Sequence, residues 1–194
     1  MIAIFRRLDR FLNRLYSSKY NPILASGTIA LGLFVIVAFS GLYLIFFYQL
    51  GAPYESVQVL SEDYWVGSWI RSIHRYGSDL MVVAVVFHIL RLIAQGKSWG
   101  PRTLAWLTGV GLLFLMLVSG WTGFVMVWDS QAHLVAVAGA RIFDQLGIFP
   151  DPILRSFSGA EETPASFFFL NLFLHVALPL GMVFGVWVHT SRMA

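Results

Sequence analysis

The sequence contains no cysteine and few charged residues. Without a thiol, the chain can form no disulfide, no iron–sulfur cluster on its own ligands and no thioether-linked haem. Charged types make up 12% of its 194 residues and hydrophobic types 58%, whereas about a quarter of the residues in a soluble domain are charged. This composition excludes an ordinary soluble domain.

Charge is also missing from long stretches of the chain. No charged residue occurs from Asn21 to Leu50, from Leu104 to Trp128, from Ser166 to Val188 or from Leu80 to Leu90. About 20 apolar residues cross the hydrocarbon core of a membrane as a helix. The sequence therefore predicts an all-α membrane protein, a single domain over 1–194 with four transmembrane helices near 24–50, 68–94, 103–127 and 165–190.

The first twenty residues, MIAIFRRLDRFLNRLYSSKY, alternate apolar and polar side chains at helical spacing. The apolar side chains are Ile4, Phe5, Leu8, Phe11, Leu12 and Leu15, and the opposite face carries Arg6, Arg7, Asp9, Arg10, Asn13 and Arg14. This pattern predicts an amphipathic helix over 3–17 that lies on an anionic membrane surface or packs on a partner subunit. Nothing in it is typical of a cleavable signal peptide.

The basic residues fall mostly on one side of the predicted spans. That side holds Arg6, Arg7, Arg10, Arg14, Lys19, Arg91, Lys97, Arg102 and Arg192 against Asp9 alone, and the other side holds Arg71, Arg75, Arg141 and Arg155 against nine acids. The positive-inside rule then places both termini on the cytoplasmic side. The basic residues are thus a topology signal, and we expect no nucleic-acid partner.

Four of the five histidines share one spacing. His74 and His88 lie fourteen residues apart in the second predicted span, and His175 and His189 lie fourteen apart in the fourth. Fourteen residues are two heptads and rise about 21 Å, so both residues of a pair return to one helix face. Because the two spans run in the same direction, we expect His74 level with His175 and His88 level with His189.

Two imidazoles at one level suit a flat iron porphyrin with one axial ligand on each side. Zinc would require four ligands, and a proton relay would require carboxylates, of which Asp79 is the only one inside a predicted span. Hydrogen bonding between helices is the structural alternative for each histidine. We expect Asp79 to pair with Arg75, four residues earlier on the same face.

The other two spans repeat glycine on the same period, with Gly27 and Gly41 in the first and Gly109 and Gly123 in the third. Glycine allows a neighbouring helix or a flat ring to approach the backbone closely, so these positions are candidates for packing against a porphyrin.

Porphyrin propionates need cations. Arg71 and Arg75 at the outer end of the second span and Arg91 at its inner end are candidates; snorkelling to the membrane interface is the alternative for each.

At this point the residues resemble a known family. WIRSIHRYGSDLMVVAVVFHILR (69–91) resembles the second helix of cytochrome b, especially of cytochrome b6, and LAWLTGVGLLFLMLVSGWTGFVMVWD (104–129) resembles the third helix and the segment after it. The resemblance covers most of the chain. It implies a four-helix bundle with two non-covalent, bis-histidine b-type haems, the outer one on His74 and His175 and the inner one on His88 and His189.

The resemblance also implies an assembly. It predicts a dihaem subunit that carries electrons across a bacterial cytoplasmic or thylakoid-like membrane, between quinone or quinol and partner redox subunits. Those partners would be a Rieske iron–sulfur protein and a c-type cytochrome. The chain ends after the fourth predicted span, like the split form of the family, so we also expect a second-half cytochrome b subunit.

Two other functions remain open. VMVWDSQ (125–131) and Leu170 depart from the family pattern, which makes a dihaem anchor that links a dehydrogenase or reductase to the quinone pool without a Rieske partner the main alternative. A structural or pore-forming bundle without a cofactor is the third possibility.

Quinone chemistry itself has only weak candidates. His133, on a predicted surface helix, is a candidate proton acceptor at the outer quinol site, or an interfacial histidine that contacts a partner or water. At the inner side we expect quinone near Lys19, Ser26 and Arg192.

Overall fold

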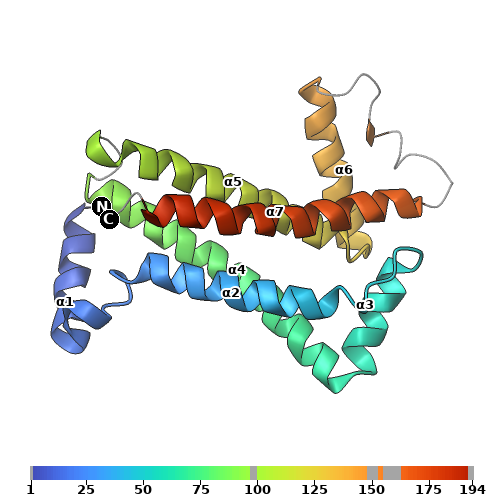
Figure 1. Ribbon diagram of the computed structural model, residues 1–194, viewed down its shortest axis with the longest axis horizontal. Coiled ribbons are helices and arrows are strands. Elements are labelled where there is room, and N and C mark those ends of the chain that lie inside the picture. Colours follow the sequence, from blue (N-terminus) through green and yellow to red (C-terminus); the bar gives the residue numbers. More distant parts are fainter. Residues whose placement is uncertain (1, 97–99, 148–152, 155–162, 192–194) are drawn as a thin grey trace. The chain divides into compact units, whose positions relative to one another are not determined.

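The computed structural model describes residues 2–96, 100–147, 153–154 and 163–191 (Figure 1). All regular secondary structure in these ranges is helical. Four helices are long and apolar enough to cross a membrane: α2 (Ser26–Leu44), α4 (Trp65–Ala94), α5 (Thr103–Val125) and α7 (Ala165–Ser191). The prediction of an all-α, multi-pass membrane protein with four spans is therefore confirmed.

The remaining elements are α1 (Ile2–Tyr20), α3 (Pro53–Glu62), the 3₁₀ turn η1 (Gly100–Arg102) and α6 (Ser130–Gln145). The helix α3 was not predicted, and α2 ends at Leu44, well before the predicted end near residue 50. The uncharged run continues there, but it leads into Gly51 and into Pro53 at the start of α3. Glycine and proline favour turns over helix continuation. The apolar composition of the run therefore does not show where the helix ends.

Residues 1–46, 66–113 and 184–194 form one unit of the structure. In this unit α2 packs on α4, where Gly77 faces the side chain of Val37. A Cβ added at Gly77 would lie only 3.1 Å from Val37 Cγ2. The first half of α5 packs on the end of α7, where Gly185 faces Leu112 in the same way. Small residues thus bring both helix pairs close together.

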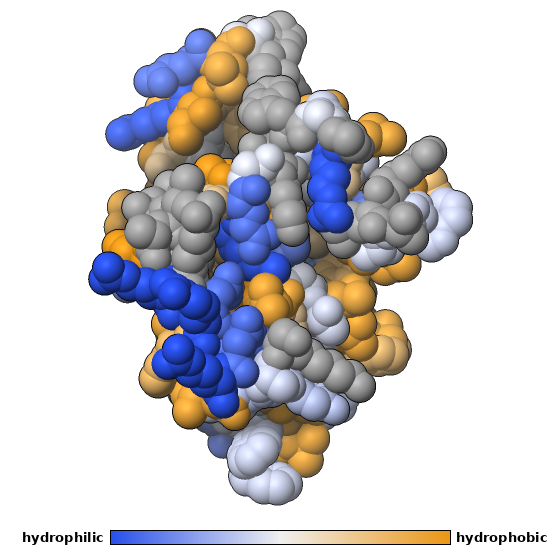
Figure 2. Space-filling model, turned by 90° about the vertical axis from the view of Figure 1, so that its left-hand side faces the viewer, coloured by the Kyte–Doolittle hydropathy of each residue, from blue (hydrophilic) through white to orange (hydrophobic). Residues whose placement is uncertain are grey.

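Within this unit, α1 is steeply inclined to α2 (Figure 1). Its charged face exposes Arg7, Arg10 and Arg14, and an apolar stripe is exposed as well, formed by Ile4, Leu8, Phe11 and Leu15. Figure 2 looks onto the end of the molecule that carries α1, and hydrophilic and apolar side chains lie side by side there. The predicted amphipathic character is therefore present; binding to a membrane surface stays a prediction.

The turn between α1 and α2 is held by Asn21, which is fully buried. Its Nδ2 donates to Asn13 Oδ1 at 2.8 Å, and its Oδ1 accepts from the backbone N–H of Ile23 at 3.0 Å. Such a side-chain turn fixes where α2 begins, because the asparagine replaces backbone partners that a helix would supply.

Residues 47–65 and 114–183 form a second unit. Asp129 begins α6 by accepting from the backbone N–H of Ala132 at 2.7 Å, as a helix N-cap does. Helix α6 then packs on α5, where Gly139 lies against the Trp121 ring. The Tyr48 hydroxyl donates to the carbonyl of Met126 at 2.9 Å, and burial raises the pKa of this phenol, so it stays a neutral donor. These two units do not test the prediction of a single domain over 1–194, which stays a prediction.

Candidate functional site

Each of the four histidines at two-heptad spacing lies against one of the four predicted glycines. The pairs are His74 with Gly41, His88 with Gly27, His175 with Gly123 and His189 with Gly109. A Cβ added at Gly27, Gly41 or Gly109 would lie 3.0, 2.9 or 3.1 Å from Cε1 of its histidine, closer than ordinary van der Waals contact. Glycine is therefore needed at these positions to admit an imidazole ring against the neighbouring helix.

A hydroxyl group precedes every one of these glycines and approaches Nδ1 of the same histidine. The distances between oxygen and Nδ1 are 3.4 Å for Ser26 and His88, 3.1 Å for Ser40 and His74, 3.0 Å for Thr108 and His189, and 3.4 Å for Thr122 and His175. This role of the hydroxyl groups was not predicted from the sequence. A fourfold Ser-Gly or Thr-Gly dipeptide on the fourteen-residue period was the signal that could have revealed it.

Backbone carbonyls define the protonation of two of these rings. His74 Nδ1 lies 3.0 Å from the carbonyl of Val37, and His175 Nδ1 lies 2.8 Å from that of Ser119. A carbonyl only accepts, so Nδ1 carries the hydrogen, and in the neutral ring Nε2 then carries the lone pair. This is the tautomer of a histidine that binds a metal through Nε2.

The predicted inner pair lies within one unit of the structure. His88 on α4 and His189 on α7 are close enough to act on each other electrostatically. His74 and His175 belong to different units, so their pairing at one level stays a prediction from the helix spacing.

Arg91, the predicted cation at the inner end of α4, is partly engaged. Its NH1 donates to the carbonyl of Leu24 at 3.0 Å. Its Nε is buried and has no hydrogen-bond partner among the described residues. Arg91 also acts electrostatically on His88, one turn earlier on the helix. A buried guanidinium N–H without an acceptor is costly, so this position suits an anionic group.

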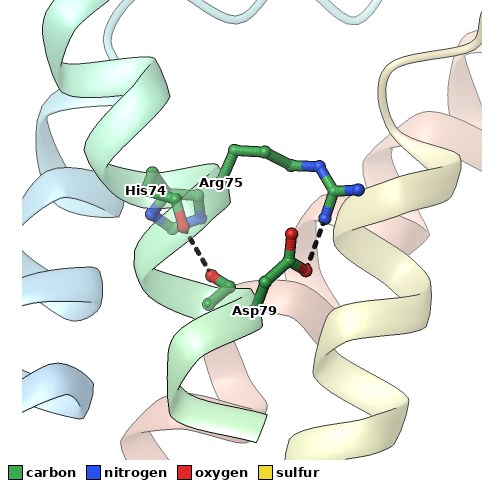
Figure 3. A network of polar contacts seen from close by, with 4 residues as sticks. His74, Arg75 and Asp79 are labelled. Carbon is green, nitrogen blue, oxygen red and sulfur yellow. Dashed lines mark hydrogen bonds and ion pairs between the residues drawn. The ribbon is translucent and has the colours of Figure 1, made fainter. Parts of the chain in front are cut away.

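Arg75 and Asp79 form an ion pair, with NH1 and Oδ1 2.8 Å apart (Figure 3). The predicted pairing is therefore confirmed. Both side chains are more than half exposed, at 53% and 57%, and they extend from the side of α4 away from the His74 ring. Arg71 lies one turn earlier on the same helix; its role at a propionate stays a prediction, as does that of Arg75.

His133 lies at the start of α6 and packs against an aromatic cluster. Its ring centroid is 5.4 Å from that of Trp128, which also contacts Phe167 and Phe168. Trp128 has a φ of 55°, a strained conformation for a bulky residue. His133 thus has a packing role, and its role in quinol oxidation stays a prediction. Of the inner quinone candidates, Ser26 lies against His88, and Arg192 and the Lys19 side chain lie outside the described residues.

Comparisons with known proteins identify one family. The family described as cytochrome b/b6/petB matches residues 11–193. The chain is 30% identical over 156 residues to the menaquinol:cytochrome c reductase cytochrome b subunit of Geobacillus thermodenitrificans, covering 77% of this chain and 70% of that one. It is 28% identical over 173 residues to cytochrome b6 of Heliobacterium modesticaldum, covering 86% and 81%.

Among solved structures, a chain of a hyperthermophilic respiratory Complex III has the same fold, with a TM-score of 0.77 and 21% sequence identity. The similarity covers 88% of this chain but only 47% of that one. This chain therefore spans about half the length of the solved relative.

Proposed function

The chain belongs to the cytochrome b/b6 family, and we propose that it is the cytochrome b subunit of a bc-type complex that oxidises quinol. Membership in this family implies haem. In the proposed role the subunit carries electrons across the membrane, between quinol or quinone and the partner redox subunits. The similarity to a menaquinol:cytochrome c reductase subunit over 77% of the chain supports this assignment.

The observation that carries the proposal is the fourfold repeat of one local site. Each site combines a histidine, a glycine against its ring and a hydroxyl at its Nδ1. We assign two non-covalent b-type haems to these sites, the outer one to His74 and His175 and the inner one to His88 and His189. Four hydrogen-bonded histidines on two helices would not need a common period if they only joined neighbouring helices.

The donor chemistry fits this group. Nδ1 hydrogen bonds to carbonyls leave Nε2 as the electron-pair donor, which is the form that binds haem iron. The buried Nε of Arg91 suits a propionate of the inner haem. Arg71 and Arg75 are proposed for the outer haem, where the Asp79 carboxylate would share Arg75 with a propionate.

When bound, the haems supply one-electron redox chemistry. The chain's own residues supply the rest. The histidines would hold the haem iron through Nε2, the glycines give the imidazole rings their space, and the arginines would balance the propionate charge. The apolar helices exclude water from the path between the two levels, which lie about 21 Å apart along a helix.

We further propose the setting of this subunit. It lies in a bacterial cytoplasmic or thylakoid-like membrane with both termini on the cytoplasmic side, following its basic residues. Its partners are a second-half cytochrome b subunit, a Rieske iron–sulfur protein and a c-type cytochrome.

Purification of the complex from its native membrane tests this function. We expect a Rieske protein and a c-type cytochrome to co-purify, and quinol-dependent reduction of an added c-type cytochrome. A preparation that retains two b-type haems but contains only a dehydrogenase or reductase would replace this function by that of a dihaem anchor.

A further inference from the structure

His88 differs from the other three histidines in how its Nδ1 is held. His74 and His175 each combine a hydroxyl with a backbone carbonyl, and at His189 the Thr108 hydroxyl is itself bonded to the backbone carbonyl of Ala105. Among the described residues, His88 Nδ1 has a single hydrogen-bond partner, the Ser26 hydroxyl at 3.4 Å.

The difference originates in the position of each hydroxyl residue in its helix. Ser40, Thr108 and Thr122 lie inside α2 or α5, and each donates to the carbonyl three residues earlier, at 2.9, 3.0 and 2.8 Å. Those carbonyls belong to Val37, Ala105 and Ser119; those of Val37 and Ser119 also accept from His74 and His175, and the backbone of Ala105 acts on His189. Hydroxyl and carbonyl therefore form a double acceptor for Nδ1–H.

Ser26 is the first residue of α2, so the residues before it form a turn. Two carbonyls of this turn accept from other donors. That of Ile23, three residues earlier, accepts from the Ser26 backbone N–H at 3.4 Å, and that of Leu24 accepts from Arg91. Among the described residues no backbone carbonyl forms a hydrogen bond with His88 Nδ1, so the Ser26 hydroxyl is its one partner.

We propose that Ser26 is a positioning residue that sets the reduction potential of the inner haem, as the only acceptor for Nδ1–H of His88 in the described part of the chain. This inference rests on the proposed function, because it requires His88 to be an axial ligand. An acceptor at Nδ1 raises the basicity of a ligating imidazole and so stabilises the oxidised iron. Removal of the Ser26 oxygen leaves Nδ1–H without an acceptor, and the inner potential rises.

Thr108 provides a matched control on the same haem. Its hydroxyl serves His189, the opposite axial ligand, and the Ala105 backbone stays in place when that hydroxyl is removed. Thr108→Val therefore causes a smaller rise than Ser26→Ala. Ser26→Thr keeps an acceptor oxygen and restores the wild-type potential.

The experiment is a redox titration of the b-type absorbance bands in the purified complex, with low-temperature EPR of the oxidised haems. Ser26→Ala should move one of the two redox waves upward and change one of the two EPR signals. Selective loss of one haem in Ser26→Ala, with both kept in Thr108→Val and Ser26→Thr, also supports the proposal.

Two unchanged waves in Ser26→Ala, or equal effects of Ser26→Ala and Thr108→Val, would overturn the assignment of Ser26 and leave the proposed function intact. A wild-type complex without b-type bands would instead overturn the proposed function itself.

Discussion

Replacement of Gly27 by alanine tests the contact between α2 and the inner histidine. The added Cβ would lie 3.0 Å from Cε1, 3.2 Å from Nδ1 and 3.7 Å from Nε2 of His88. Ordinary contacts of a Cβ are 3.4 Å or longer, so the ring must move by several tenths of an ångström. Because Ser26 holds the same ring from the neighbouring position, this movement also weakens the Nδ1 hydrogen bond and turns Nε2 away from its ligand direction.

Overpacking of this kind costs about 1–3 kcal/mol. Alanine also favours a helix over glycine by about 1 kcal/mol, which would mask part of the loss. Gly32→Ala separates the two effects, since Gly32 lies on the same helix and nothing lies within 4 Å of its added Cβ. The difference in free energy between Gly27→Ala and Gly32→Ala should therefore equal the steric cost. That cost corresponds to about 5- to 150-fold weaker binding of the inner haem.

The assay is haem b per polypeptide in the purified protein, followed during a titration with a haem-scavenging apoprotein. Gly27→Ala should lose one haem and keep the other, and Gly32→Ala should keep both. Equal haem retention in the two variants would refute the reasoning, because the contact with His88 would then not require glycine at position 27.

Three further results are expected. The inner haem should have the higher reduction potential, since moving an electron inward across about 21 of 30 Å costs about 1.6 kcal/mol per 100 mV of membrane potential. In redox titrations of single-ligand variants, replacement of His88 or His189 should therefore remove the higher-potential wave. If it removed the lower-potential wave instead, inward electron flow would be contradicted. Arg91→Gln should lower the potential of that haem, since a positive charge near it is removed; an unmoved wave would argue against propionate pairing. His133→Ala should leave quinol turnover unchanged, since its ring packs on Trp128; a large loss of turnover would make it a catalytic base.

The spans and the histidines were predictable because both depend on simple periods. Uncharged runs of membrane-spanning length report a helix through composition alone, and the fourteen-residue spacing of His74 and His88 follows from helix geometry. The Arg75–Asp79 pair was predictable for the same reason, as two residues on one face of one helix.

The contacts between helices were less accessible. The glycines were expected to pack against a porphyrin, and in the structure they admit the histidine rings. The Ser-Gly and Thr-Gly dipeptides were visible in the sequence, but only the pairing of α2 with α4 and of α5 with α7 reveals what their hydroxyls bind. The single acceptor at His88 depends on where α2 begins, and helix ends are set by local turns such as that of Asn21, which composition does not report.

The number of haems on the chain tests the central claim most directly. Extraction of the haem from the purified subunit and its quantification against polypeptide should give two b-type haems per chain. Alanine at His88 or His189 should leave one haem, and alanine at His74 or His175 should leave the other, with a different absorbance maximum and potential. A wild-type chain without b-type haem, or histidine variants that all retain two, would contradict the account.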